Sequence, residues 1–415
     1  MNNAKNTTLF PYLERLLEGE AVEWKTLGEV CDYIRGITYN KSAETTEVDG
    51  WKVLRANNIT LETRKLNFNE VKHVKKTIRV RENQMLRKGD ILICAGSGSK
   101  EHIGKTAYIE SDIDYTFGGF MGVLRLKEEK TISSRYLFHY IGSGAFTTYL
   151  GATLKSSTIN NLNNGIISPF TIPVPPLRVQ ARIVEILDKF TQLEAELEKE
   201  LEAELEARKK QYAYYRDQLL NFSQCPPLNV NIEWKTLGEV CENLDSQRRP
   251  ITSSKRKKGI YPYYGASGIV DFVESYIYEG DYLLVSEDGA NLLARNTPIA
   301  FSISGKNWVN NHAHVLKFDT YEGRKFVEYY LNHIDLEPYI SGAAQPKLNQ
   351  NNLNSIPIPI PPLSEQRRIV DILDRFDTLT NSISEGLPKE IALRRKQYEY
   401  YRDALLNFPR AEVTA

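Results

Sequence analysis

The sequence lacks the features that mark several large classes of protein. It has four cysteines in 415 residues and no Cys-x-x-Cys pair, so we expect reduced thiols without a disulfide or metal role. No window approaches the roughly 18 consecutive apolar residues of a membrane span. The polar start MNNAKNTT does not resemble a signal peptide. These absences predict a cytoplasmic protein.

Motifs of catalysis are also scarce. The segment GSKEHIGKT, residues 98–106, has one residue too many before its Gly-Lys-Thr, and Ser99 stands where a phosphate-binding loop needs glycine. His312 and His314 share one face of an expected strand, but no third ligand accompanies them, so we expect hydrogen-bonded histidines rather than a metal site. We find no dinucleotide fingerprint, nucleophile elbow or zinc-protease motif. The sequence therefore predicts no catalytic residue, metal or cofactor in this chain.

An excess of charge of one sign is absent as well, since 53 Lys and Arg balance 53 Asp and Glu. The charges are nevertheless segregated: residues 192–206 are acidic, whereas residues 52–105 and 247–258 are basic. Phosphate binding depends on local basic surface rather than on net charge. The second basic stretch is expected to include phosphate contacts, because uninterrupted basic residues should not fold into a core; a solvated loop is the alternative.

What the sequence does contain is a tandem repeat with two different inserts. VEWKTLGEVC at residues 22–31 returns as IEWKTLGEVC at residues 232–241. IPVPPLRVQARIVEILDKF from Ile172 returns as IPIPPLSEQRRIVDILDRF from Ile358, and residues 208–222 closely match residues 394–408. A copied frame that holds two unlike inserts predicts two different recognition surfaces held in a fixed geometry.

Both inserts are predicted to be α+β, with the same order of elements. Short apolar runs predict strands at residues 89–95 and 121–126 in the first insert, and at 280–286 and 312–318 in the second. Helices are expected at residues 134–141 and 324–334. The inserts differ in nearly every polar residue, so we expect one fold with two surfaces.

Each insert ends in a proline-rich strand that stops before a long helix. From residue 177 to 221 this helix would be roughly 65 Å long. Apolar residues recur every fourth position and are expected to form the seam of an antiparallel coiled coil, namely Leu193, Leu197, Leu201 and Leu205 in the first helix, and Leu379, Ile383, Leu387 and Ile391 in the second. Gly386 and Pro388 should break the second helix.

These patterns predict the following organisation. A helical segment at residues 1–20 precedes a recognition domain at 21–171, a spacer helix at 172–222 and a linker at 223–230. A second recognition domain at 231–357, a second spacer helix at 358–408 and a tail at 409–415 complete the chain. Because residues 10–20 match only the end of a full unit, we expect the C-terminal helix to lie near the N-terminus.

Polar loops in matching places of both inserts suggest contacts with DNA. Arg, Lys, Asn and Gln pair with base edges, and Ser, Thr and backbone amides reach phosphates. The candidate DNA-binding residues of the first insert are Lys75, Lys76, Arg79, Arg81, Lys100, Lys105 and Lys155. Those of the second are Arg248, Arg249, Lys255, Arg256, Lys257, Lys258, Arg295, Gln345 and Lys347.

The helix ends carry more aromatic residues than one coiled-coil face can bury. Tyr212, Tyr214 and Tyr215 in the first repeat match Tyr398, Tyr400 and Tyr401 in the second, and Tyr212, Tyr215, Tyr398 and Tyr401 are the candidate partner-binding residues. Such near-identical bands suggest two equivalent docking sites for two copies of one partner. The alternative is that these tyrosines pack against the recognition domains.

The copied EWKTLGEVC, the IPIPPLSEQRRIV exit, the RRKQYEYYRDALLNF helix end and the GAAQPKLNQNNL loop resemble the specificity subunit of type I restriction–modification systems. The likeness spans residues 10–408. It implies two target recognition domains on an antiparallel coiled coil, which read double-stranded DNA and bind two methyltransferase and two restriction subunits. S-adenosylmethionine, ATP and Mg²⁺ would belong to those partners.

Two other functions stay open from the residues alone. The chain could be part of a self-sufficient modification enzyme, although no cofactor fingerprint is present. It could also be an interaction scaffold that uses the same frame without DNA. The half-site sequences and the spacer length do not follow from the sequence.

Overall fold

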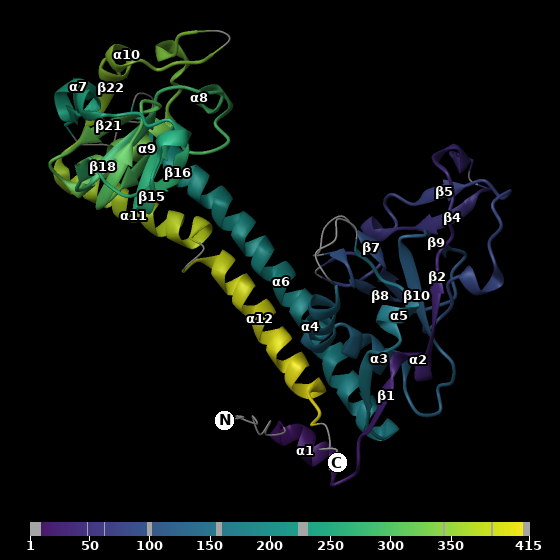
Figure 1. The fold of residues 1–415 in the computed structure, drawn as a ribbon. Coiled ribbons are helices and arrows are strands. Elements are labelled where there is room, and N and C mark those ends of the chain that lie inside the picture. Colours follow the sequence, from purple (N-terminus) through teal and green to yellow (C-terminus); the bar gives the residue numbers. More distant parts are fainter. Residues whose placement is uncertain are drawn as a thin grey trace. The chain divides into compact units, whose positions relative to one another are not determined.

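In the computed structural model, the copied segments at the two ends of each insert pair with each other (Figure 1). In the first repeat β1 (Glu23–Thr26) pairs antiparallel with β12 (Thr171–Val174). In the second repeat β13 (Glu233–Thr236) pairs in the same way with β22 (Pro357–Ile360). Each insert is therefore closed at its base by the sequence that the repeat conserves.

The described residues are 10–47, 49–61, 63–97, 102–154, 160–222, 231–342, 345–382 and 385–409. They form two units: Met1–Leu201 with Ile391–Ala415, and Glu202–Glu390. The units divide the chain within the long helices, whereas the predicted boundaries lie at the helix ends. The reason is packing, since each insert shares a hydrophobic core with the helical residues that follow it, such as Ile183 and Leu187 in the first unit.

A four-stranded antiparallel sheet with the same strand order lies at the centre of each unit. In the first unit its order is β2 (Cys31–Arg35), β10 (Met121–Leu126), β6 (Ile91–Cys94) and β8 (Thr106–Tyr108). In the second unit its order is β14 (Glu242–Asn243), β21 (Ala313–Lys317), β18 (Tyr282–Ser286) and β19 (Ala300–Ile303). The strands predicted at 89–95, 121–126, 280–286 and 312–318 are confirmed.

A second, mixed sheet is also common to both units. It contains β3 (Glu44–Thr45), β5 (Lys72–Val74), β4 (Trp51–Leu54) and β9 (Thr116–Phe117) in the first unit. Its counterpart contains β16 (Gly268–Val273), β15 (Lys258–Gly265), β20 (Lys306–Val309) and β17 (Tyr278–Glu279). Both sheets include one parallel pair, β4 with β9 and β15 with β20. The expectation of one α+β fold in both inserts is confirmed.

One helix in each unit is fastened to the start of a long helix through the same aspartate of the repeat. In the first unit, α3 (Ser134–Ile141) places Arg135 Nε and His139 Nε2 at 2.9 and 2.7 Å from Asp188. In the second, α9 (Tyr321–His333) donates two tyrosine hydroxyls to Asp374, at 2.8 and 2.5 Å. A conserved carboxylate thus accepts different donors, which lets the inserts diverge on one frame.

The long helices are α6 (Leu177–Leu220), α11 (Leu363–Asn381) and α12 (Leu387–Leu406). The predicted break between the last two is confirmed at Gly386, where a Cβ atom would lie 2.4 Å from the carbonyl oxygen of Thr378. In the first unit, α6 and α12 pack antiparallel: Thr191 bonds Tyr398 at 2.8 Å, and Glu198 pairs with Arg395.

The expected leucine seam is only partly present. Leu193 is exposed, and Ile383 lies outside the described residues. The remaining predicted positions are partly buried, namely Leu197, Leu201, Leu205, Leu379, Leu387 and Ile391. A four-residue spacing runs ahead of the 3.6-residue turn, so the stripe rotates away from any one neighbour. Aromatic and polar side chains also contribute helix contacts.

The first described helix lies against the end of the last one, as the repeat predicted. Helix α1 (Pro11–Leu17) buries Leu13 and Leu17 in the same cluster as Leu405, Leu406 and Phe408. The N-terminal segment thereby supplies the packing that the first unit needs at its base. Among the helices of the described residues, none combines the length and apolar character needed to cross a lipid bilayer.

Candidate nucleic-acid interface

Three chain segments meet beside the central sheet of each unit, at equivalent places. In the first unit β7 (Gly96–Ser97) pairs with β11 (Asn160–Asn161), and the Ala95 amide donates to the Phe120 carbonyl at 2.8 Å. In the second unit the backbone of Asp288 forms an isolated antiparallel β-bridge with that of Lys347. The Glu287 amide donates to the His312 carbonyl at 2.9 Å. Two of the predicted DNA-contacting segments of each insert thus run into this three-segment junction.

The third of these segments is held at its far end by a capped helical turn. Asn163 accepts the Ile166 amide at the start of α5 (Asn164–Ile167). Asn349 accepts the Asn352 amide at the start of α10 (Gln350–Asn354). Asparagine is a favoured N-cap because its side-chain oxygen satisfies an otherwise unpaired helix amide. In both units the third segment therefore leaves the junction into a short helix with an asparagine N-cap.

Different side chains anchor the junction in the two units. The Tyr33 hydroxyl, from β2, donates to the Leu162 carbonyl at 3.1 Å. In the second unit His314 Nε2, from β21, lies 2.7 Å from the equivalent Leu348 carbonyl. The exchange is steric, since a Cβ atom on Gly122, which corresponds to His314, would lie 2.3 Å from the Tyr33 ring.

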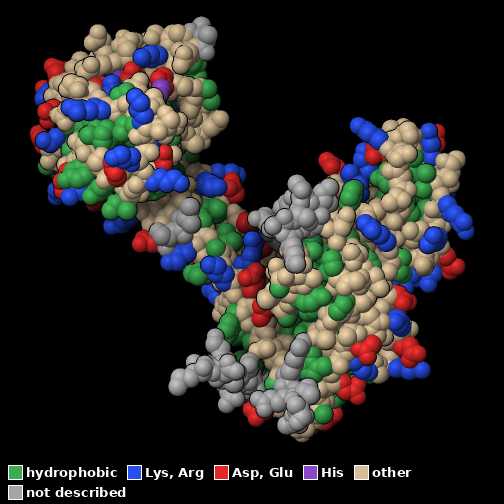
Figure 2. Space-filling model, in the orientation of Figure 1, with side chains coloured by type: hydrophobic (Ala, Val, Ile, Leu, Met, Phe, Trp, Pro, Cys, Tyr) green, Lys and Arg blue, Asp and Glu red, His purple; other side chains and the backbone are tan. Residues whose placement is uncertain are grey.

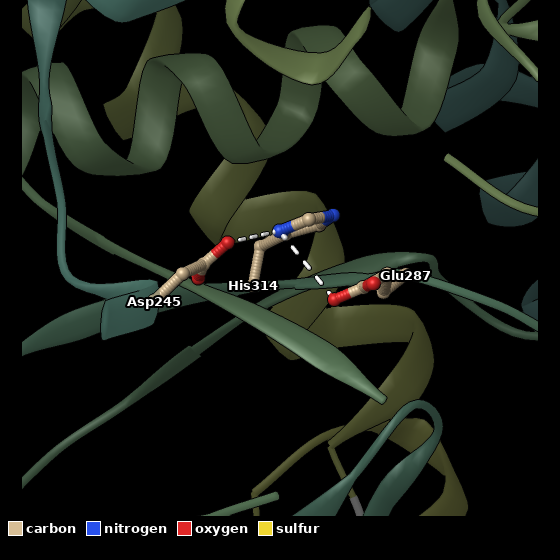
Figure 3. Close-up of side chains that lie close together, drawn as sticks. All are labelled: Asp245, Glu287 and His314. Atoms are coloured by element: carbon tan, nitrogen blue, oxygen red, sulfur yellow. Dashed lines mark hydrogen bonds and ion pairs between the residues drawn. The ribbon is translucent and has the colours of Figure 1, made fainter. Parts of the chain in front are cut away.

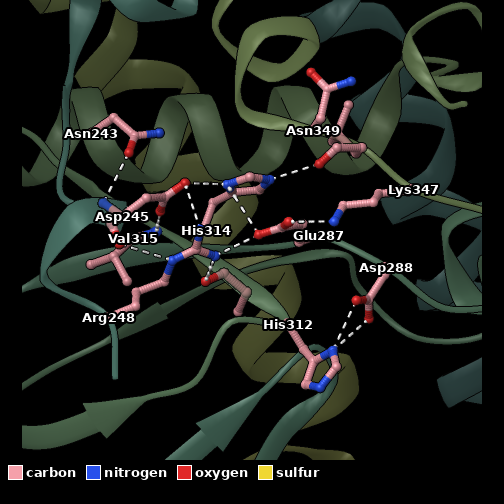
Figure 4. Close-up of polar contacts among 12 residues, drawn as sticks. Asn243, Asp245, Arg248, Glu287, Asp288, His312, His314, Val315, Lys347 and Asn349 are labelled. Carbon is pink, nitrogen blue, oxygen red and sulfur yellow. Dashed lines mark hydrogen bonds and ion pairs between the residues drawn. The ribbon is translucent and has the colours of Figure 1, made fainter. Parts of the chain in front are cut away.

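His314 is the centre of a buried ionic network in the second unit (Figures 3 and 4). Its Nδ1 lies 2.5 Å from Asp245 Oδ2, and Asp245 Oδ1 accepts the Val315 amide at 2.9 Å. The Glu287 carboxylate forms ion pairs with the Arg248 guanidinium at 2.6 Å and with the Lys347 ammonium at 3.1 Å. The network ties residues 245–248 and two segments of the junction, at Glu287 and Lys347, to the sheet.

The charges of the network determine its protonation. The Leu348 carbonyl can only accept, so His314 Nε2 must carry a hydrogen. Burial opposes ionisation of Asp245, but its hydrogen bond and charge interaction with His314 hold the pKa of this carboxyl below its ordinary value. Burial opposes ionisation of Glu287 too, and Arg248 and His314 lower its pKa. Both carboxyls are therefore ionised partners of the cations around them.

The same three side chains could be mistaken for a metal site, because ligand atoms of Asp245, Glu287 and His314 lie within 4.8 Å of one another. Two acidic groups therefore accompany His314, although the sequence suggested no further ligand; His312 does not belong to this group. Each of these carboxylate oxygens nevertheless already has a partner: Arg248, Lys347, the Val315 amide or the His314 ring. Charge balance and geometry describe an ion-pair network rather than a cation site.

The basic residues from Arg248 to Lys258 are not all free to meet phosphate, which corrects the expectation that none would enter a core. The Arg248 side chain is 13% exposed within the network. The Arg256 side chain is 16% exposed, stacks over Tyr263 at 4.3 Å and donates to the Ile251 carbonyl. The exposed members are Arg249, Lys255, Lys257 and Lys258. Arg248 and Arg256 lie inward because each forms an ion pair with an acid of another segment, Glu287 and Asp271 respectively.

The candidates in the first unit also divide. Lys75, Lys76, Arg79 and Arg81 are exposed around the second sheet, and Figure 2 shows Lys and Arg side chains gathered on the part of the unit that carries β4 and β5. Lys105 donates to the Ile59 carbonyl at 2.8 Å, so its ammonium points inward. Lys100 and Lys155 lie outside the described residues.

The remaining candidates of the second unit have separate environments. Arg295 donates to the carbonyls of Leu331 and Ile334, at 3.3 and 2.8 Å, and so caps the end of α9. Burial lowers the pKa of this guanidinium. Gln345 and Lys347 are exposed at the junction. The structure therefore favours a structural role for Arg295 and leaves the other two accessible to DNA.

The tyrosines predicted to bind a partner are mostly engaged within the helices. Tyr212 and Tyr215 lie against Phe376, with ring centroids 6.1 and 5.6 Å away. Tyr398 bonds Thr191, and Tyr401 lies against Phe190. The most exposed aromatic residues of these bands are Tyr214, at 61%, and Tyr400, at 66%.

Comparisons with known proteins agree with this architecture. The family model of the type I restriction modification DNA specificity domain matches residues 20–207 and again residues 229–393. The specificity subunit of the type I restriction enzyme EcoR124I/EcoR124II of Escherichia coli is 31% identical over 97% of this chain and 98% of its own length.

Two further likenesses are partial or concern the fold alone. A relative from Haemophilus influenzae is 43% identical, over 42% of this chain and 46% of that relative. A solved structure that concerns complex assembly and conformational transition of the type I restriction–modification system matches with a TM-score of 0.66. It is 20% identical, over 94% of this chain and 98% of its own.

Proposed function

The chain belongs to the type I restriction–modification specificity family, and we propose that it is the non-catalytic, sequence-reading subunit of such a complex. It binds double-stranded DNA at a bipartite target. One insert reads each half-site, and the bases between the half-sites are not read. The two half-sites differ because the two inserts offer different side chains on the same fold.

One observation carries this proposal. The junction of three segments is conserved in backbone hydrogen bonds, while its side chains are exchanged: Phe120 corresponds to His312, and Gly96 to Asp288. Different exposed side chains on the same backbone frame are what two readers of different sequences require. Sequence is read by such groups at base edges, whereas phosphate contacts give affinity.

Partners supply the chemistry in this proposal. Two methyltransferase subunits bind the repeated helix ends, and two restriction subunits join them. S-adenosylmethionine, ATP and Mg²⁺ belong to these partners, so methylation and cleavage occur outside this chain. The near-identity of residues 208–222 and 394–408 supports two equivalent docking sites.

The test is to express the chain with a type I methyltransferase subunit and to map methylated bases across the genome. We expect one motif of two defined blocks separated by a constant number of undefined bases. The methyltransferase alone should leave no such motif. A continuous motif would contradict the two-domain proposal, and no methylation above the methyltransferase alone would contradict the role in specificity.

A further inference from the structure

We propose that two equivalent residue triplets read base edges in the two half-sites: Gly96, Phe120 and Asn161 in the first unit, and Asp288, His312 and Lys347 in the second. We call them the first and the second reading triplet. The proposal deepens the proposed function and rests on it. It assigns specificity to residues that, except for Lys347, neither composition nor charge singled out.

The two triplets occupy the same three backbone positions. Gly96 pairs with Asn161 as Asp288 pairs with Lys347. The carbonyl oxygen of Phe120 accepts the Ala95 amide just as that of His312 accepts the Glu287 amide. The equivalence follows from backbone hydrogen bonds and not from sequence likeness, since no position has the same amino acid in both triplets.

Both triplets present side chains to solvent. Phe120 is 65% exposed at the turn that leads into β10, and the His312 and Lys347 side chains are 50% and 52% exposed. Asn161 is exposed as well. Single exposed apolar residues are common on proteins. Here the exposed phenylalanine stands where the other unit carries a hydrogen-bonding ring, and this substitution indicates different ligands.

The first triplet suits an A·T pair. Gly96 has no room for a side chain, because a Cβ atom there would lie 2.9 Å from the Phe120 ring and 2.6 Å from Asn161 Oδ1. The glycine thus brings an apolar ring and a carboxamide together. Asparagine pairs with adenine N6 and N7, and an apolar side chain contacts the methyl group of thymine. We therefore expect an A·T pair where this triplet reads.

The second triplet suits a G·C pair. Both oxygens of Asp288 lie within 2.9 Å of His312 Nδ1, so the carboxylate holds the hydrogen on that nitrogen. Figure 4 shows the other ring nitrogen turned away from Asp288. The Lys347 ammonium, 3.1 Å from Glu287, offers donors that match guanine O6 and N7. Hydrogen bonding replaces the apolar contact of the first triplet.

Both triplets rest on rigid supports, which specificity requires. Leu162 follows Asn161 directly, and its carbonyl is held by Tyr33. Leu348 follows Lys347, and its carbonyl is held by His314 in the buried network. Glu287 in that network also orients the Lys347 ammonium at 3.1 Å. The buried anchors thus fix the positions from which the exposed residues reach the bases.

The experiment maps the methylated motif of Phe120→Ala and of His312→Ala, each expressed as the full chain with the methyltransferase. Phe120→Ala should lower discrimination at one A·T position of one half-site by about tenfold or more, the order expected when one base edge is no longer read. His312→Ala should lower discrimination by a similar factor at one G·C position of the other half-site. Both residues are exposed, so folding should survive, and circular dichroism checks this.

Two matched controls separate base reading from surface disturbance. Phe68→Ala removes another exposed phenylalanine of the first unit, and His333→Ala removes another carboxylate-paired histidine of the second. Both should keep the whole motif. Unchanged motifs in Phe120→Ala and His312→Ala would overturn the triplets while leaving the proposed function intact. A loss in the same half-site for both would overturn the pairing of triplets with half-sites. Absence of a bipartite motif in the unaltered chain would overturn the proposed function itself.

Discussion

Replacing His314 with leucine should destabilise the second unit while leaving the first unit unchanged. The substitution removes the partner of Asp245 and leaves the Leu348 carbonyl without a donor inside a buried site. A broken buried pair costs roughly 3–5 kcal/mol. Arg248 at 3.2 Å and the Val315 amide still compensate Asp245. We therefore expect a loss of about 3 kcal/mol in the free energy of unfolding.

The matched control is Tyr33→Phe in the first unit. It removes one neutral hydrogen bond to the equivalent Leu162 carbonyl and no charge. The expected loss is about 1 kcal/mol, confined to the first unit. The two variants thus set an anchor that is bonded to a buried carboxylate against one that is not, at the same place in the same fold.

Native-state hydrogen exchange in urea is the suitable assay, because it reports each unit separately. The slow amides of β21 should lose protection in His314→Leu, and those of β10 in Tyr33→Phe. An effect of His314→Leu below about 1 kcal/mol, the size of an ordinary hydrogen bond, would refute the reasoning. Equal losses in both units would refute it as well.

The same network predicts how the difference changes with pH. The folded pKa of Asp245 lies below its ordinary value of 3.8, as that of Glu287 lies below 4.5. A carboxyl with a lowered folded pKa adds stability above its unfolded pKa and loses it as pH falls through the folded value. The stability gap between the unaltered chain and His314→Leu should therefore be full near neutral pH. It should narrow in acid below these ordinary values.

Three further predictions concern DNA and partner binding. Neutralising the exposed lysines of the second basic stretch, Lys255, Lys257 and Lys258, should make the slope of log affinity against log salt concentration less steep. The expected change is about 0.9 for each phosphate that a lysine had neutralised. An unchanged slope in filter binding would exclude these lysines from the interface. Deleting residues 197–200 shortens α6 by roughly 6 Å, so motif mapping should show the unread spacer reduced by one or at most two base pairs of about 3.4 Å; a folded variant with the original spacer would refute a helical ruler. Replacing Tyr214 and Tyr400 with serine should weaken binding of both methyltransferase copies, which mass photometry would show, and a saturating stoichiometry of one for the unaltered chain would contradict two equivalent sites.

Local patterns predicted much of the fold because they act over short distances. The apolar run at residues 134–141 is helical over the predicted residues. The second helix is broken near Gly386, where the Thr378 carbonyl lies too close to leave room for a side chain. The α+β class followed from the short apolar runs of the inserts and the repeat from the copied frame, and both are confirmed.

The candidate site was harder to predict, because it depends on which strands become neighbours. Arg248 and Arg256 belong to a basic run, yet acids that are distant in sequence, Glu287 and Asp271, draw them inward. The match between Tyr33 and His314 is invisible in a linear comparison, since the two residues lie on different strands. The spacing of His312 and His314 was the one available signal, and it indicated hydrogen-bonded histidines.

The central claim is that two copies of one fold read two different half-sites independently. The most direct measurement replaces residues 245–355 with the second insert of another family member and maps the methylated motif. The account predicts that one half-site changes, while the other half-site and the spacer stay the same. A change in both half-sites, with the chain folded and methylation active, would contradict it.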